Sequence, residues 1–382
     1  MNTNEILRYF QTREQEILRS IRALVEIETP SRDVSGSVRI VDLICSQIEK
    51  LKCVDSIERV FAENYGEHLI VRAFSNSHEK SILLLGHLDT VYPVGTLSER
   101  SFRIENDRVF APGIFDMKSG AALMFEALRC LEDLGLKPFA PITILLTCDE
   151  EIGSNTSREI VEREARNALF CLVCEPAAPF GKVKTGRKGV GGFQVKAHGI
   201  ASHAGLEPEK GASAIVEIAR QIQKIHALND FEKGTTLNVG KVRGGTATNV
   251  VADFAACNVD VRFTVMSEAL RIEQLIRNLT PFDERIKLEI IGEINRPPLE
   301  RTTEIVKLFE KAREIAASFD YELGETQVGG ASDGNFVAAS GVPVLDGLGV
   351  SGGGAHSIQE HVLLSDIAKR ATLITSLLIQ NN

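Results

Sequence analysis

Apolar runs of strand length alternate with helix-like segments in the first half of the chain, and no other feature limits the possible folds as strongly. The runs are "SILLLG" (81–86), "PITILLT" (141–147) and "LFCLVC" (169–174), and helical patterns lie near 119–135 and 154–166. Strands that are apolar along their whole length belong in a parallel sheet whose two faces are covered. We therefore expect an α/β fold with a mostly parallel sheet flanked by helices.

The pattern changes after the third apolar strand, at the glycine-rich joint "TGRKGVGG" (185–192). From there to "NRPP" (295–298) the expected elements follow the order strand, helix, strand, strand, helix, strand. That order forms a complete ferredoxin-like α+β unit. Because 382 residues exceed the usual size of one hydrophobic core, two domains are expected. We predict an outer domain of residues 1–181 and 294–382 and an inserted domain of residues 182–293.

Composition excludes several classes of protein. The formal net charge of −9 argues against a nucleic-acid partner, which would need a basic face. The apolar stretches are much shorter than a membrane span, and the N-terminal segment lacks the pattern of a secretory signal. Seven scattered cysteines favour reduced thiols and a cytoplasmic location. Cys171 and Cys174 are spaced like a metal-binding pair, but they lie in an apolar run without a second pair, so we interpret them as core thiols.

Histidine and acidic side chains occur where the apolar strands should end. Ligands of open parallel sheets bind beyond the carboxyl ends of the strands. Taken singly, each residue has an ordinary interpretation as a packed histidine, a helix cap or a solvated acid. Their coincidence is what favours a functional site. The residues are His87 and Asp89 in "GHLDTVYP" (86–93), Asp116 in "APGIFDMKSG" (111–120), Asp149, Glu150 and Glu151 in "TCDEEIGS" (147–154), Glu175 in "VCEP" (173–176) and His356 in "SGGGAHS" (351–357).

Two histidines and three carboxylates from this set suit two divalent ions. Mixed imidazole and carboxylate ligation favours zinc, and the same ligands could accept cobalt or manganese. One carboxylate can bridge two such ions at a separation of about 3.5–4 Å. We therefore expect two Zn²⁺ per chain, with Co²⁺ or Mn²⁺ as substitutes.

The motifs "GHLDTVYP", "APGIFDMKSG", "TCDEEIGS", "VCEP" and "GGAHS", in this order, resemble those of the co-catalytic di-zinc metallopeptidases. That family includes glutamate carboxypeptidase of the carboxypeptidase G type, aminoacylase, acetylornithine deacetylase and succinyl-diaminopimelate desuccinylase. The resemblance covers nearly the whole chain, and the inserted domain is similar to the family's lid or dimerisation domain. "SHAG" and "GGASDG" are most similar to the glutamate carboxypeptidase branch, whereas "DMKSG" is equally similar to the desuccinylase branch.

The resemblance implies a role for each metal-ligand candidate. His87 and Glu175 correspond to ligands of one zinc ion, and Glu151 and His356 to ligands of the other. Asp116 corresponds to the carboxylate that bridges the two ions. In the family a cis peptide often follows this acid, but the sequence does not reveal the state of the bond here.

Three further residues are implied as catalytic. Glu150 resembles the general base that takes a proton from the water bridging the ions. Asp89 resembles the acid that orients His87, a role typical of a carboxylate beside a metal-bound imidazole. His203, in "ASHAG", resembles the histidine that reaches the active site of a partner subunit and helps to stabilise the oxyanion. That role implies a homodimer formed through the inserted domain. Without the resemblance, His203 would be interpreted as a surface loop residue.

Four residues are candidates for substrate binding. Arg296, in "INRPP", matches the family arginine that holds the free carboxylate of the leaving amino acid, since the planar guanidinium suits a carboxylate. Arg262, in "NVDVRF", is either a second such residue or an ordinary strand-surface charge. Asn249, in "TATNVV", resembles a residue that contacts substrate across the dimer. Gly330, in "VGGASDG", either presents its amide to an anion or belongs to a plain tight loop.

The expected function is therefore a zinc-dependent hydrolase. We expect a metallo-carboxypeptidase or amidohydrolase that releases a C-terminal amino acid, perhaps glutamate, from a small peptide or N-acyl amino acid. The first alternative is a small-molecule N-deacylase of the aminoacylase, acetylornithine deacetylase or desuccinylase type. The second is a non-catalytic binding module on the same scaffold, which would lack a ligand or the base. Every one of those residues is present in this sequence.

Overall fold

The computed structural model describes residues 3–75 and 80–379, and the chain divides into two compact units. The outer unit comprises Met1–Thr185, Arg301–Gln327 and Ser332–Asn382, and the inserted unit comprises Gly186–Glu300 and Val328–Ala331. The boundaries expected from the sequence, 182 and 293, lie a few residues before those observed.

One short segment differs from the expected division. Residues 328–331 were expected in the outer domain, but they belong to the inserted unit. Hydrogen bonds within that unit explain the difference. The amide of Lys188 donates to the carbonyl of Val328 at 3.0 Å, and the guanidinium of Arg187 donates to the carbonyls of Gly330 and Ala331, at 3.2 Å each.

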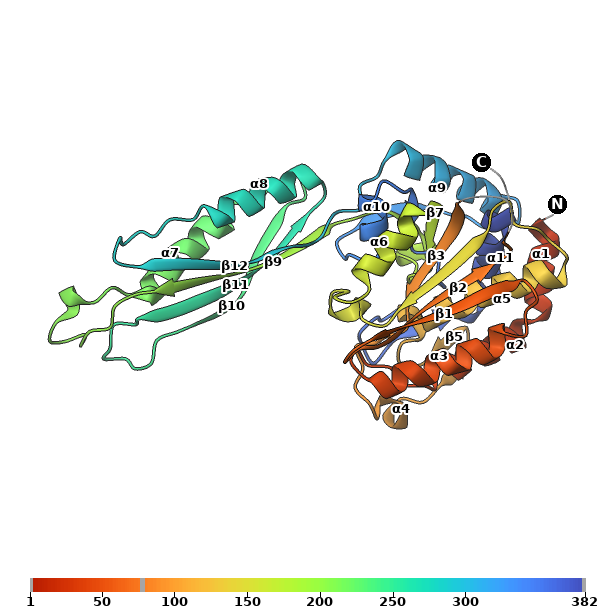
Figure 1. The fold of residues 1–382 in the computed structure, drawn as a ribbon, viewed down its shortest axis with the longest axis horizontal. Coiled ribbons are helices and arrows are strands. Elements are labelled where there is room, and N and C mark those ends of the chain that lie inside the picture. Colours follow the sequence, from red (N-terminus) through yellow and green to blue (C-terminus); the bar gives the residue numbers. More distant parts are fainter. Residues whose placement is uncertain (1–2, 76–79, 380–382) are drawn as a thin grey trace. The chain divides into compact units, whose positions relative to one another are not determined.

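The outer unit is built on a six-stranded sheet. In spatial order its strands are β1 (Val54–Ala62), β2 (Gly66–Ala73), β6 (Ile142–Thr147), β3 (Ser81–His87), β7 (Ala168–Val173) and β14 (Val344–Leu345) (Figure 1). The last four strands in this order are parallel, whereas β2 and β1 pair in antiparallel fashion. The predicted mostly parallel sheet is confirmed. Strand β6 is buried along its whole length, as expected for a mostly apolar strand inside a covered sheet, and the hydroxyl of its interior Thr143 is hydrogen-bonded to Ser81 at 2.9 Å.

Helices flank this sheet (Figure 1). Helix α5 is buried along almost all of its length, because its sequence "SGAALMFEALRCLED" supplies small and apolar residues on most sides. Helix α11 packs against α5 and against α1 at the start of the chain. The helices of the outer unit are α1 (Thr3–Thr12), α2 (Glu14–Val25), α3 (Val34–Ile48), α4 (Thr96–Glu99), α5 (Ser119–Asp133), α6 (Arg158–Arg166), α9 (Thr303–Ala317), α10 (Gly334–Ala339) and α11 (Leu364–Ile379).

Two smaller sheets complete the topology. One has the strand order β15 (Gly352–Gly353), β16 (His361–Leu363), β5 (Arg108–Phe110), β4 (Arg103–Glu105), and the other pairs β13 (Glu325–Val328) with β8 (Val183–Arg187). In the first, β16 pairs antiparallel with β5, and His361 lies opposite Phe110. This pairing joins the C-terminal part of the chain to the segment that leads into α5.

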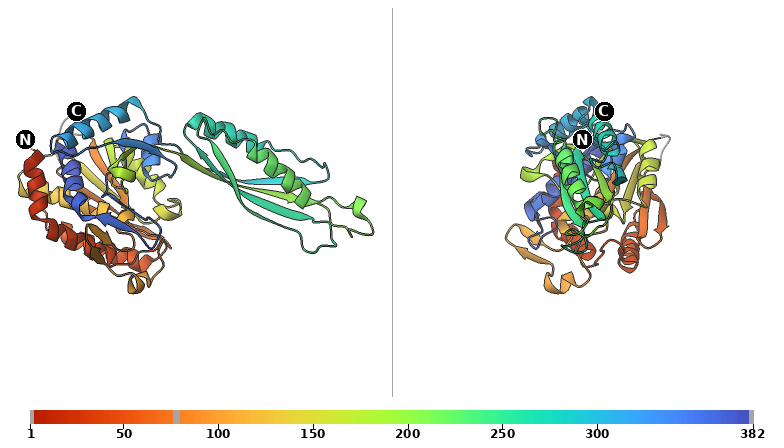
Figure 2. Two further views of the ribbon diagram at one scale, coloured as in Figure 1. Left: turned by 180° about the vertical axis from the view of Figure 1, so that it is seen from behind. Right: turned by 90° about the vertical axis from the view of Figure 1, so that its left-hand side faces the viewer.

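The inserted unit has the predicted order of elements. They are β9 (Gly189–His198), α7 (Ala214–His226), β10 (Thr236–Gly244), β11 (Phe254–Phe263), α8 (Met266–Arg277) and β12 (Lys287–Arg296), and the four strands form an antiparallel sheet in the order β10-β11-β9-β12 (Figure 2). The glycine-rich joint is extended rather than looped. At Gly189 a Cβ atom would lie 2.1 Å from the ring of Phe263, so glycine leaves the space that this ring fills.

Within residues 3–75 and 80–379, no helix combines the length and apolar character that crossing a membrane requires.

Candidate metal centre

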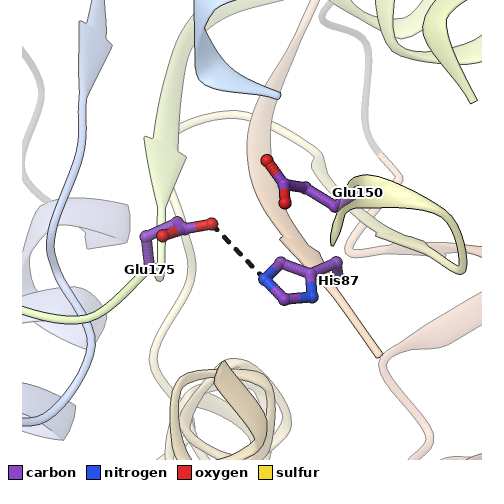
Figure 3. Close-up of side chains that lie close together, drawn as sticks. All are labelled: His87, Glu150 and Glu175. Carbon is purple, nitrogen blue, oxygen red and sulfur yellow. Dashed lines mark ion pairs between the residues drawn. The ribbon is translucent and has the colours of Figure 1, made fainter. Parts of the chain in front are cut away.

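Three strands of the main sheet end side by side, and each delivers a polar side chain (Figure 3). His87 is the last residue of β3 and lies opposite Thr147, the last residue of β6. Glu150 opens the short 3₁₀ turn (Glu150–Ile152) that follows β6, and Glu175 follows the end of β7. Figure 3 shows these side chains converging, with His87 Nε2 3.4 Å from Glu175 Oε1. The parallel register therefore brings distant parts of the sequence to one edge.

Asp116 lies between the two predicted histidine ligands. Its Oδ1 is 3.1 Å from Nε2 of His87, and its Oδ2 is 3.4 Å from Nε2 of His356. Each carboxylate oxygen thus faces a different imidazole, the arrangement a bridging carboxylate needs. The peptide bond between Asp116 and Met117 is cis.

The second histidine has its own acidic neighbour. Nε2 of His356 lies 3.3 Å from Oε2 of Glu151, whose side chain is 7% exposed. The other oxygen of Glu151, Oε1, is buried and has no hydrogen-bond partner among the described residues. A buried carboxylate oxygen without a donor is unfavourable unless something else balances its charge.

These residues fit a divalent metal site. His87, Asp116 and Glu151 each offer one ligand atom, and these atoms lie within 4.8 Å of one another; the same holds for His87, Glu150 and Glu175. Nitrogen and oxygen donors of this kind suit zinc. The unpartnered oxygen of Glu151 is the observation that favours a cation most directly, since a bound ion would satisfy it.

The pKa shifts within the cluster also favour a bound cation. Burial, together with the carboxylates of Asp116 and Glu150, raises the pKa of Glu151 to about 8. A hydrogen bond to Asp116, followed by attraction to Glu151, raises the pKa of His356 to about 9. Both shifts favour the protonated forms, so the surroundings of these two groups stabilise added positive charge. A divalent cation would replace that positive charge at the same place.

Asp89 contacts both halves of the site. The nearest acceptor for Nδ1 of His87 is the main-chain carbonyl of Asp89, at 2.9 Å, whereas the Asp89 carboxylate is 3.5 Å away. That carboxylate accepts from the amides of Glu150 and Glu151, at 3.1 and 3.2 Å, and from Ser31 Oγ at 2.7 Å. Asp89 therefore orients the imidazole mainly through its backbone and holds the glutamate turn through its side chain.

Two buried acids that the sequence reasoning assigned no role also hold this turn. Asp333 accepts from Thr147 Oγ1 at 2.9 Å and from Ser154 Oγ, the two ends of the "TCDEEIGS" segment. Asp149 accepts from the amide and hydroxyl of Thr156, at 2.6 and 2.8 Å. The sequence motif showed that Asp149 is acidic, but it did not indicate that this side chain holds the turn through hydrogen bonds. No sequence signal connects Asp333 to a segment so far away.

His203 and Asn249 are neighbours in the inserted unit. The amide of Ala204 donates to the carbonyl of Asn249 at 2.9 Å, and both predicted residues are exposed. Nδ1 of His203 faces the amides of Gly205 and Leu206, at 3.1 Å each. Because Nδ1 accepts these bonds, the neutral ring carries its proton on Nε2.

The remaining substrate-binding candidates also lie in the inserted unit. Arg262 forms a two-point ion pair with Asp260, two residues before it on the same strand, at 2.9 and 3.1 Å. That geometry fits its interpretation as a strand-surface charge. Arg296 is 4% exposed at the end of β12. The carbonyl of Gly330 accepts from Arg187, another buried arginine, which the sequence reasoning missed.

Comparison with known proteins gives an independent view of the chain. The model of the family described as "Peptidase family M20/M25/M40" matches residues 83–380. Carboxypeptidase G2 from Pseudomonas sp. (strain RS-16) is 30% identical over 374 residues, covering 95% of this chain and 88% of that protein. Succinyl-diaminopimelate desuccinylase from Verminephrobacter eiseniae is 30% identical over 314 residues, covering 77% of this chain and 76% of the relative.

Solved structures show the same fold. Aminopeptidase PepT from Bacillus cereus superposes with a TM-score of 0.79 at 22% identity, covering 96% of this chain and 98% of that chain. The metallo-carboxypeptidase Sso-CP2 from Sulfolobus solfataricus gives a TM-score of 0.71 at 17% identity, covering 95% and 98%. At these identities the likeness concerns the fold.

Proposed function

The chain belongs to the peptidase family M20/M25/M40, a family of metal-dependent hydrolases, and from this premise we propose that it is a two-zinc enzyme that releases a C-terminal amino acid from a peptidyl or N-acyl substrate. The observation that carries the proposal is the position of Asp116. Its two carboxylate oxygens face different histidines, and each histidine has a glutamate beside it.

In this proposal five residues of the chain bind the two zinc ions. His87 and Glu175 would hold one zinc ion, Glu151 and His356 the other, and Asp116 both. When bound, the ions would supply Lewis acidity, polarising the substrate carbonyl and lowering the pKa of water toward neutrality.

Proton transfer would fall to Glu150. It accepts a proton from the attacking water and passes it to the leaving nitrogen. Its neighbour Glu151 is unsuited to that step, because a carboxylate engaged as a ligand is a poor base. Asp89 fixes the main chain at Glu150 with a 3.1 Å hydrogen bond, which keeps the base in place.

Substrate recognition would involve the inserted unit. His203 would donate from Nε2 to the developing oxyanion of a second subunit in a homodimer, with its ring set by the two amides at Nδ1. Arg296 would pair with the carboxylate of the leaving amino acid. Asn249 and Gly330 would contribute further polar contacts. Arg262 is a weaker candidate, since Asp260 already occupies its guanidinium.

The released amino acid is proposed to be glutamate, because "SHAG" and "GGASDG" resemble the glutamate carboxypeptidase branch of the family. The alignment with carboxypeptidase G2 along 95% of this chain is consistent with a carboxypeptidase. A deacylase acting on a small N-succinyl or N-acetyl amino acid is the second candidate. It is favoured by the 30% identity to a succinyl-diaminopimelate desuccinylase.

A substrate panel separates the two candidates. The purified chain with added zinc is assayed against a peptidyl-glutamate, N-acetyl amino acids and an N-succinyl amino acid, with and without chelator. We expect the largest kcat/KM for the glutamate-terminated substrate and loss of turnover on chelation. A preference for the N-succinyl substrate would favour the deacylase instead. Turnover that survives complete zinc removal would contradict the metal-dependent mechanism.

A further inference from the structure

Glu360 is a buried acid that binds the loop carrying Asp116. Its side chain accepts hydrogen bonds from three main-chain amides: Gly113 N–H donates to Oε2 at 2.9 Å, and Phe115 N–H and Asp116 N–H donate to Oε1 at 2.9 and 3.0 Å. Glu360 is only 3% exposed. Hydrogen bonds from amides to an ionised carboxylate are stronger than those between neutral groups. The main chain at Asp116 is therefore held directly by this side chain.

The position of Glu360 in the chain connects that loop to the second histidine. It lies four residues after His356 and directly before strand β16. The pairing of His361 with Phe110 brings the start of β16 next to the end of β5, after which the Asp116 loop begins. Glu360 thus joins the Asp116 loop to the His356 loop.

The His356 loop needs such support. His356 adopts a left-handed backbone conformation, with φ of 59°, which is unfavourable for a residue with a side chain. Its imidazole is half exposed, so packing alone does not fix it. A second contact comes from the Tyr92 hydroxyl, which donates to the carbonyl of Ser357 at 3.1 Å.

We propose that Glu360 is a positioning residue that sets the separation between the Asp116 carboxylate and the His356 imidazole, and that it thereby determines how tightly the centre holds metal. This inference rests on the proposed function, because it assumes that these two side chains are ligands. It adds a residue outside the ligand set to the determinants of metal affinity.

The test replaces Glu360 by glutamine in the full chain. The side-chain NH₂ group of glutamine would then face a main-chain N–H group, and two donors cannot form a hydrogen bond. The negative charge that strengthens the remaining hydrogen bonds would also be lost. We expect zinc affinity, measured by competition with a chromophoric chelator, to fall about 10- to 100-fold, the usual effect of changing a residue that supports metal ligands. Excess zinc should restore most of the activity.

The chain offers a matched control in its other unit. Glu217 is 2% exposed and accepts from the amides of Phe282 and Asp283, so Glu217→Gln makes the same chemical change away from every predicted ligand. This variant is expected to lose some thermal stability and to keep wild-type zinc affinity. If both variants keep wild-type zinc affinity, or both lose it equally, Glu360 has no specific positioning role.

A second variant covers the case in which Glu360→Gln does not fold. Glu360→Asp keeps the charge but shortens the side chain, so it cannot reach all three amides. It should fold and bind zinc with intermediate affinity, and wild-type affinity would overturn the inference. The measurement is independent of the substrate panel. A wild-type chain that binds no zinc would contradict the proposed function itself, whereas tight binding unaffected at position 360 contradicts only this inference.

Discussion

Glu150 and Glu151 are adjacent in the sequence, but the structure gives them different surroundings. Glu151 faces His356, and its buried Oε1 has no hydrogen-bond partner within residues 3–75 and 80–379. Glu150 lies with His87 and Glu175 (Figure 3). Asp89 binds both main-chain amides, so the turn that carries the two side chains is held in place. Two neighbouring glutamates can thus take the separate roles of ligand and base.

If Glu150 is the base and Glu151 a ligand, the variant Glu150→Gln should lose activity and keep its metal. Glutamine keeps the size of the side chain but cannot accept a proton, so kcat should fall by about 10²- to 10⁴-fold while zinc content is retained. Turnover and metal content are measured on the same preparation. The exposed Glu159 on α6 provides the control, and Glu159→Gln should leave both unchanged. Wild-type turnover in Glu150→Gln would remove this residue from the base role.

The candidate ligands could be proposed from the coincidence of histidine and acidic side chains with strand ends, whereas the supporting acids Asp333 and Glu360 could not. His87, Glu151 and Glu175 follow apolar strands, and a strand end is recognisable from local sequence. Asp333 and Glu360 act on hydroxyls and main-chain amides that are distant in the chain. Because such groups occur throughout a protein, no local pattern identifies their partners.

At the scale of elements, α5 and β7 meet at a point where only glycine fits. A Cβ atom on Gly120 would lie 1.9 Å from the carbonyl oxygen of Cys174, the residue before Glu175. Helix α5 follows the loop that carries Asp116, so this contact helps to set the distance between two predicted ligands. The approach of helix to strand is part of the geometry of the centre.

Gly120→Ala should therefore destabilise the chain, although alanine normally favours a helix. The added methyl group meets a main-chain atom that cannot move without shifting β7, which is expected to cost about 1–3 kcal/mol. Thermal unfolding and zinc content measure the effect. Gly192→Ala, in open space on β9, is the control and should change stability by less than about 1 kcal/mol. Unchanged melting of Gly120→Ala would show that the contact can relax.

The elements that the sequence predicted are those whose pattern is local. Strands β3, β6 and β7 are mostly apolar runs, and the order of elements in the inserted unit follows from alternation and helical spacing. The small sheet containing β5 and β16 was missed. Its strands are three residues or fewer, and the partner of Phe110 is His361, far along the chain.

For the whole molecule, the proposed homodimer predicts complementation between inactive variants. If each site combines Glu150 of one subunit with His203 of the other, a heterodimer of Glu150→Gln and His203→Ala contains one complete site and one doubly altered site. The heterodimer, purified through two different tags, should show about half of wild-type activity. Each variant alone should remain nearly inactive. No recovery in the heterodimer would place both residues within one subunit's site or argue against the dimer.

The outer unit is assembled from the two ends of the described chain. Helix α1 packs against α11. Along the sequence the predicted ligands extend from His87 to His356, and the whole inserted unit lies between the last two of them, Glu175 and His356. During translation, the inserted unit can therefore fold on emerging from the ribosome while its host is still incomplete. The core of the outer unit and the full set of predicted ligands can form only near the end of synthesis. A chain whose synthesis stops before residue 356 therefore contains His87 but lacks His356.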